Sequence, residues 1–86
     1  MTYQIVLSPE AKKNLRRIRD QRLHDRLTAA IADLGTDPRP SGCLKLVGES
    51  DQWRIRVGDW RIVYRIDDGR VVVVVVRVAP RSGAYG

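Results

Sequence analysis

The most regular part of the sequence reads Trp53-Arg-Ile-Arg-Val-Gly-Asp-Trp-Arg-Ile-Val-Tyr-Arg-Ile66, with apolar and charged residues alternating on both sides of Gly58-Asp59. A period of two is typical of β-strands, and a two-residue connection with glycine is typical of a tight hairpin. We therefore expect two antiparallel strands here. The predicted pairs are Val57 with Trp60, Arg56 with Arg61, Ile55 with Ile62, and Arg54 with Val63.

One face of this predicted hairpin carries a cluster of arginines. The cluster comprises Arg54, Arg56, Arg61 and Arg65, and the other face carries Trp53, Ile55, Val57, Trp60, Ile62, Tyr64 and Ile66. Like charges placed directly across a hairpin are unfavourable. The cluster therefore predicts an anion between the side chains, and phosphate is the anion that we expect there.

Composition limits the class of protein. The 86 residues predict a single domain spanning 1–86, and 16 Lys+Arg against 10 Asp+Glu give a net charge of +6. Such a balance favours nucleic acid, an anionic surface or an acidic protein as partner. The lone Cys43 fits a reducing compartment, and no leader or apolar run long enough to span a bilayer occurs. We expect a cytoplasmic protein with no membrane partner.

The N-terminal half predicts one strand and two helices. Tyr3 to Leu7 alternate as a strand, and Ser8-Pro9-Glu10 is typical of a helix start. A first helix follows with an apolar stripe at Ala11, Leu15 and Ile18 and a basic remainder. We expect a break at residues 20–22, or else one kinked helix, and then a second apolar stripe that ends at Gly35 as the C-terminal cap.

The C-terminal half predicts the rest of the sheet. Residues 44–46 predict a short edge strand, and Asp68-Gly69 predicts a second tight turn into a central strand at residues 71–78 that Pro80 ends. With that turn, Tyr64 pairs with Val73 and Arg61 with Val76. One sheet face is then apolar and should bury the helices, while the other is a valine floor edged by arginines.

Most enzymatic sites find no support in the sequence. His24 is the only histidine and has no partners at metal-ligand spacing, and neither a Ser-His-acid set nor a glycine-rich phosphate loop occurs. We expect no cofactor and no metal. What remains is arginine and tyrosine, which can bind RNA phosphates, stack on a base and stabilise charge at a scissile phosphate. The set comprises Lys45, Arg54, Arg56, Arg61, Arg65, Arg81 and Tyr85.

These residues make the chain resemble the RelE/ParE superfamily of type II toxins, and the RelE branch more than the ParE branch. The resemblance covers nearly the whole length. It rests on Ser8-Pro9-Glu10-Ala11, Asp37-Pro38-Arg39-Pro40, Leu44-Lys45-Leu46, the segment 53–65, the valine strand and the tail from Arg81 to Tyr85.

The resemblance implies an α+β fold, with two N-terminal helices packed on one face of a mainly antiparallel four- to five-stranded sheet. It implies a metal-independent mRNA endonuclease that acts on the ribosome and is held inactive by a cognate antitoxin. Arg61 and Arg81 would hold the phosphate and stabilise the transition state, and Tyr85 would stack on a base or take part in proton transfer. Arg54 and Arg56 would position the RNA backbone.

The chain departs from the RelE pattern at two places. Some relatives carry lysine where Arg54 and Arg56 stand, and many carry a histidine where this chain has Ala79-Pro80. Arginine stays protonated and is a poor general base, so the proton acceptor is unassigned. Two alternatives therefore stay open, a ParE-like inhibitor of DNA gyrase and an inactive protein of the same fold that binds nucleic acid or antitoxin. A small, acidic antitoxin that folds on binding is the expected partner.

Overall fold

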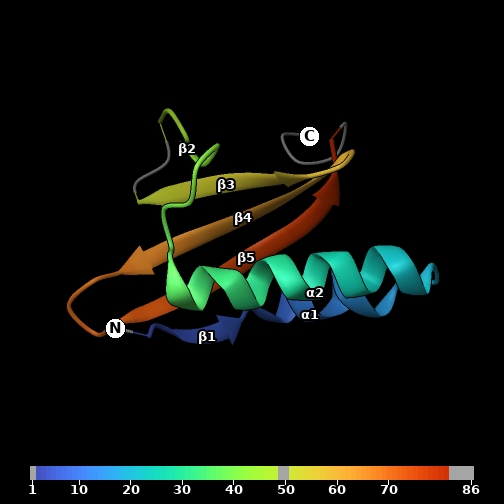
Figure 1. The fold of residues 1–86 in the computed structure, drawn as a ribbon, viewed down its shortest axis with the longest axis horizontal. Coiled ribbons are helices and arrows are strands. Elements are labelled where there is room, and N and C mark those ends of the chain that lie inside the picture. The colour runs from blue at the N-terminus through green and yellow to red at the C-terminus, as the bar shows by residue number, and fades with distance from the viewer. Residues whose placement is uncertain (1, 49–50, 82–86) are drawn as a thin grey trace.

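The computed structural model describes residues 2–48 and 51–81, which form two helices and one five-stranded sheet (Figure 1). The elements are β1 (Gln4–Leu7), α1 (Pro9–Arg16), α2 (Gln21–Thr36), β2 (Leu44–Lys45), β3 (Gln52–Val57), β4 (Trp60–Asp67) and β5 (Val72–Pro80). The strand order is β1-β5-β4-β3-β2, with only the β1–β5 pair parallel. The predicted α+β fold is confirmed. No helix in the described part of the chain is long and apolar enough to cross a bilayer.

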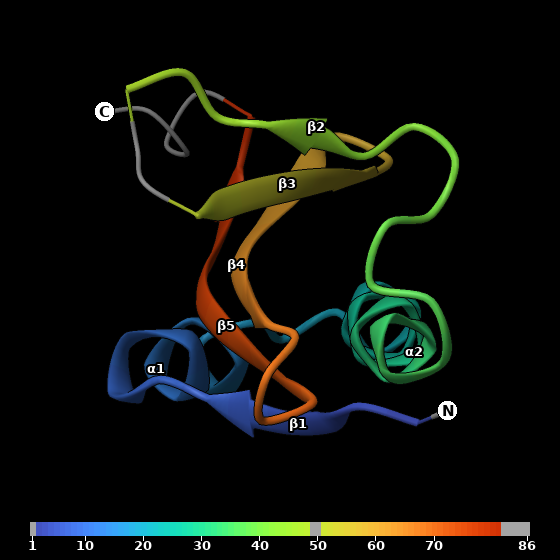
Figure 2. The same cartoon turned by 90° about the vertical axis from the view of Figure 1, so that its left-hand side faces the viewer.

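A single hydrophobic core joins both helices to the sheet. Figure 2 shows α1 and α2 at the level of β1, β5 and β4, with β3 and β2 at the other edge. The largest fully buried side chains include Leu27 and Leu34 of α2 and Tyr64, Ile62 and Val75 of the sheet. These strand residues belong to the face for which the sequence predicts helix packing, because residues of one strand face share a period of two.

Two capping side chains set the helix starts. The Ser8 hydroxyl accepts a hydrogen bond from the Ala11 N–H at 3.0 Å, and Pro9 stands at the first helical position, as predicted. The Asp20 carboxylate accepts from the N–H groups of Arg22 and Leu23 at 3.0 and 3.3 Å. The break therefore lies at residues 17–20 and not at 20–22, and the single kinked helix is ruled out because Asp20 caps a new helix.

Gly35 has a different role from the predicted cap. It lies inside α2, which ends at Thr36, and Asp37 is the C-terminal capping residue. Its carbonyl accepts a hydrogen bond from the Tyr3 N–H at 2.6 Å, and a Cβ on Gly35 would come within 3.0 Å of the Tyr3 carbonyl oxygen. The glycine is needed because the backbone at the start of β1 lies directly against α2.

The register of β4 with β5 differs from the prediction. Tyr64 pairs with Val75 rather than Val73, and Arg61 pairs with Ala79 rather than Val76. The turn is longer than two residues because the Asp67 carboxylate accepts from the Arg70 N–H at 3.0 Å and Val71 takes a positive φ of 59°. An irregularity between Val63 and Tyr64 then shifts the pairing by one more residue.

Helix α1 covers the part of β5 that β1 does not reach. The pairing of β1 ends at Leu7 with Val75. Beyond it, the Ser8 N–H and hydroxyl donate to the carbonyls of Val75 and Val76 at 2.9 and 2.6 Å, and Asn14 Oδ1 accepts from the Val78 N–H at 3.0 Å. Strand β5 is therefore covered along its length, and beyond β1 its edge groups are hydrogen-bonded by the capping residue Ser8 and by Asn14 of α1.

Replacing Gly35 by alanine tests the close contact between α2 and β1. In an ordinary helix this substitution stabilises, because alanine has the higher helix propensity. Here we expect Gly35→Ala to lower the free energy of unfolding by about 1–2 kcal/mol, because the new methyl group overpacks the Tyr3 carbonyl. Urea unfolding measures the difference. The control Ala29→Gly, at an exposed α2 position, should cost about 1 kcal/mol through propensity alone, and a stabilised Gly35→Ala protein would contradict the contact.

Candidate nucleic-acid interface

The β3–β4 hairpin places the arginine cluster on one sheet face. Arg56 pairs with Arg61, Arg54 with Val63, and Gln52 with Arg65, which confirms the predicted register of this hairpin. Directly opposed residues have Cβ atoms about 5 Å apart, and diagonal neighbours lie about 7–8 Å apart. The cluster is therefore a continuous stripe, with the Arg56–Arg61 pair at the turn and Arg65 at the far end.

The cluster combines buried and exposed guanidinium groups. Arg61 is 7 % exposed and is the one buried charged residue in the described part of the chain, whereas Arg56 and Arg65 are exposed. Arg54 is half-buried, and its Nε has no hydrogen-bond partner among the described residues. The ion pairs found within residues 2–48 and 51–81 join Arg39 to Asp68, Arg70 to Asp67, and Arg77 to Glu10. No carboxylate of the described chain is therefore in an ion pair with Arg54, Arg56 or Arg65.

The end of β5 brings Arg81 to the same hairpin turn. The Arg81 N–H donates to the Asp59 carbonyl at 2.7 Å, and Trp60 pairs with Pro80. Arg81 is exposed. The backbones of Arg61 and Arg81, which are twenty residues apart in the sequence, therefore lie at the same end of the sheet.

One predicted site residue, Lys45, lies away from this arrangement, and another, Tyr85, is not described. Lys45 pairs with Trp53 across β2 and β3, so it lies on the opposite sheet face from the arginines. Its Nζ lies 5.9 Å from the centroid of the Trp53 ring. Tyr85 lies outside the described residues, and its role stays a prediction.

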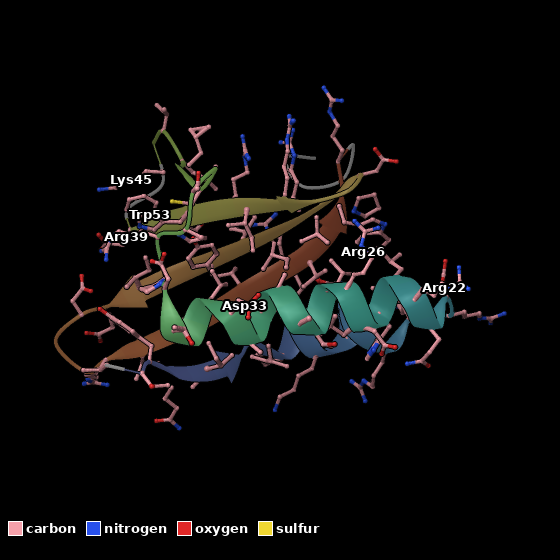
Figure 3. All side chains as sticks on the ribbon, viewed as in Figure 1. Arg22, Arg26, Asp33, Arg39, Lys45 and Trp53 are labelled. Atoms are coloured by element: carbon pink, nitrogen blue, oxygen red, sulfur yellow. The ribbon has the colours of Figure 1, made fainter. Side chains whose placement is uncertain are left out.

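A second cluster of charged and aromatic residues, which the sequence pattern does not indicate, lies near the β4–β5 turn at the opposite end of the sheet. Arg39 lies 5.2 Å from the centroid of the Trp53 ring and donates to both carboxylate oxygens of Asp68 at 3.3 and 2.9 Å. The Tyr3 hydroxyl donates to Asp68 at 2.7 Å. Figure 3 shows Arg39 and Lys45 beside Trp53, away from Arg22 and Arg26 at the start of α2. This cluster ties the loop before β2 to β1 and to the β4–β5 turn.

The electrostatics of the two ends differ. The hydrogen bonds from Arg39 and Tyr3 lower the pKa of Asp68, and the bond to Asp68 raises the pKa of Tyr3. Burial raises the pKa of Tyr64, whose hydroxyl donates to the Pro38 carbonyl at 2.7 Å. Tyr64 is therefore a neutral structural phenol, and the negative charge near the β4–β5 turn is already compensated, whereas the hairpin end presents cations.

The arginine stripe can bind and stabilise a phosphodiester but has no base of its own. Guanidinium groups donate planar, charged hydrogen bonds to phosphate and stay protonated at neutral pH. In residues 2–48 and 51–81 no three side chains of histidine, cysteine, aspartate or glutamate gather as a metal site. The chemistry that this face favours is positioning and charge stabilisation rather than proton abstraction.

Comparisons with known proteins agree on one family. Residues 5–85 match the family described as the ParE toxin of the type II toxin-antitoxin system, parDE. The chain is 28% identical to the toxin RelG of Mycobacterium tuberculosis, over 99% of this chain and 98% of that protein. Among solved structures it resembles RelE of the RelE–RelB complex from Pyrococcus horikoshii, with 26% identity, a TM-score of 0.82 and coverage of 98% and 100% of the two chains. The isolated RelE toxin of E. coli gives 28% identity, a TM-score of 0.78 and coverage of 96% and 90%.

Removing one charge from the opposed pair tests its electrostatic cost. Arg56→Gln should raise the free energy of unfolding of the free protein by about 0.5 kcal/mol at low salt, because like charges across a hairpin repel. The gain should shrink in 1 M salt, where such repulsion is screened. Lys12→Gln, an exposed substitution of equal charge on α1, is the control. Urea unfolding at two salt concentrations measures both changes. An equal change in the free energy of unfolding for Arg56→Gln and Lys12→Gln at each salt concentration would refute the repulsion.

Asp68 makes stability depend on pH at the opposite end of the sheet. Its pKa is lower in the folded state, so its contribution is present above the unfolded pKa of about 4 and is lost as the pH falls below it. Asp68→Asn should therefore lower the melting temperature at pH 7 but have little effect at about pH 3. Thermal unfolding followed by circular dichroism measures this. Asp33→Asn, at an exposed carboxylate without a hydrogen bond or ion pair among the described residues, should show no such difference.

Proposed function

The chain belongs to the RelE/ParE superfamily of type II toxin-antitoxin toxins, and from this we propose that it is a ribosome-dependent mRNA endonuclease that inhibits translation. The single observation that carries the proposal is the placement of Arg54, Arg56 and Arg61 on one face of the β3–β4 hairpin, with the backbone of Arg81 bonded to its turn. Relatives over nearly the full length are RelE-type toxins. A set of arginines without a general base suits RNA cleavage because RNA carries its own nucleophile.

In the proposed reaction the RNA supplies the nucleophile, and the protein supplies alignment and charge stabilisation. The 2′-hydroxyl of the substrate attacks the adjacent phosphorus, and the 5′-oxygen of the next nucleotide leaves. The protein aligns these atoms and neutralises the charge that develops on the phosphate oxygens. Arg61 and Arg81 bind the scissile phosphate in this scheme, and Arg54 and Arg56 bind the neighbouring backbone.

Proton transfer needs a group outside the arginine stripe. Tyr85 is the proposed group that stacks on a base or exchanges a proton, and it follows Arg81 by four residues. Lys45 and Arg65 are proposed to contact RNA at the periphery, Arg65 on the arginine face and Lys45 from the opposite face. The ribosome is the proposed source of further alignment, since an arginine face alone lacks a base.

A gyrase inhibitor is the second candidate, because the matched family is described as the ParE toxin of parDE. A protein of that kind would bind gyrase and would not need arginines converging on a phosphate. The two candidates separate in cells. Induced expression of an endonuclease leaves cuts within translated codons and an intact chromosome, whereas gyrase inhibition causes a DNA-damage response with intact mRNA.

Arginine substitutions test the proposed cleavage. Arg81→Ala and Arg61→Lys should lower the cleavage rate of ribosome-bound mRNA by about 10²–10³-fold, because each removes or displaces a donor that stabilises the transition state. Arg81→Ala is the safer variant for folding, since Arg81 is exposed and Arg61 is buried. Mapping of transcript ends after induction is the measurement.

The matched control is Arg70→Ala, which removes an equal charge from the exposed β4–β5 turn. It should leave the cleavage pattern unchanged. Full toxicity of both site variants, with melting temperatures like that of the parent protein, would refute the endonuclease.

We also propose that a small, acidic antitoxin binds this chain, as RelB binds RelE in the solved complex from Pyrococcus horikoshii. The net charge of +6 and the cationic sheet face support an acidic partner. Co-expression with the adjacent gene product should give a complex that survives size-exclusion chromatography and abolishes toxicity. Elution of the toxin alone, with toxicity retained, would contradict this proposal.

A further inference from the structure

A pocket of about 520 Å³ lies where α1, the link to α2 and the end of the sheet meet. Its apolar wall comprises Ile18, Leu23, Trp60, Val78 and Pro80. Figure 1 shows the hairpin turn and the end of β5 on the same side of the molecule as the start of α2. The volume falls within the range of small-molecule sites, and an apolar lining with few polar groups is typical of such sites.

Trp60 gives this pocket a flat aromatic surface. The residue packs against the core but is half-buried, so part of it is accessible. Aromatic rings of this kind stack on nucleobases with little dependence on base identity. The pocket wall therefore suits a planar ring system better than a flexible chain.

The rim of the pocket is cationic. Arg17 and Arg19 line it, are exposed, and take part in no ion pair within the described chain. The carboxylate of Asp20 also lines the pocket, but it accepts the N–H groups of Arg22 and Leu23 as the cap of α2. Two arginines and one carboxylate leave a net positive charge in the pocket lining, which favours a phosphate group beside the planar ring.

The pocket adjoins the proposed phosphate site. Trp60 pairs with Pro80. Arg61 follows Trp60 in β4, and Arg81 directly follows the end of β5. Neighbouring residues of a strand are about 3.3 Å apart and point to opposite faces. The aromatic pocket and the arginine stripe thus occupy the two faces of one sheet end, so a single RNA strand that bends around this end contacts both.

We propose that this pocket binds an unstacked nucleobase of the RNA strand whose neighbouring phosphate lies on the arginine stripe. This inference rests on the proposed function. Trp60 stacks on the base, and Arg17 and Arg19 bind the phosphate of the same nucleotide. The ligand class is a nucleoside monophosphate unit, and the site holds the strand in place without taking part in the chemical step.

The two tryptophans provide a direct test on the full chain. Each gives one indole N–H signal in a ¹H–¹⁵N spectrum, and Trp53 lies in the cluster near the β4–β5 turn, beside Arg39 and Lys45. Addition of adenosine 5′-monophosphate should shift the Trp60 signal and leave the Trp53 signal in place. Trp60→Phe assigns the signals, and Trp53→Phe gives the same assignment if the first variant does not fold.

Matched probes and variants define the ligand. Adenosine should shift the Trp60 signal at higher concentration than the monophosphate, and ribose 5-phosphate should not shift it. Arg17→Gln and Arg19→Gln should each weaken monophosphate binding by about threefold, the effect of one exposed ion pair. Arg16→Gln, at the neighbouring exposed last residue of α1, which does not line the pocket, should not weaken it.

Three results would overturn the nucleotide site. They are no shift of the Trp60 signal, an equal shift with ribose 5-phosphate, and a shift caused by a bound antitoxin but not by the monophosphate. The cleavage test is separate from this binding test. Arg61→Ala should abolish mRNA cleavage, but adenosine 5′-monophosphate should still shift the Trp60 signal of this variant. The pocket and the proposed endonuclease can therefore fail independently.

Discussion

The pairing of Arg56 with Arg61 across the β3–β4 turn is the constraint around which the functional end of this protein is built. The pair is electrostatically unfavourable, yet the register that creates it is also the register that buries Ile55 and Ile62 on the other face. A slip of one residue would turn the arginines into the core and the apolar side chains into water. The burial of Ile55 and Ile62 therefore fixes the register that places the two arginines opposite each other.

The two ends of the sheet use arginine in opposite ways. At the β4–β5 turn, Arg39 is neutralised by Asp68, and the contact with Trp53 and the Tyr3 hydroxyl makes a closed structural cluster. At the β3–β4 turn, Arg81 is fastened by its backbone to Asp59, which leaves its guanidinium group for other partners. Both ends of the sheet carry arginines. The ion pair with Asp68 makes Arg39 part of a structural cluster, whereas the arginines at the β3–β4 turn form the candidate binding surface.

Sequence periodicity predicted the strand register correctly where a tight turn fixed the number of residues between the two strands. Gly58 takes a φ of 60°, which glycine adopts readily, so the β3–β4 register followed from the pattern alone. The β4–β5 register did not follow, because valines at residues 71–76 fit a strand equally well at every offset. The side chain of Asp67 and the irregularity opposite Val63 chose the offset, and neither has a signature in the pattern.

The order of residue types along the chain was thus enough to predict the two helices and the arginine stripe, because alternation and capping are local. The assignment of Arg61 and Arg81 to one phosphate site came from the family resemblance and stays a prediction. Three features needed the assembled fold. Lys45 faces away from the arginines because β2 pairs by Lys45 with Trp53, Gly35 serves a contact with β1 from thirty-two positions earlier, and Trp60 lines a pocket formed by three separate segments. Each depends on which backbone lies against which, and such contacts arise from packing between distant parts of the chain, which local pattern does not encode.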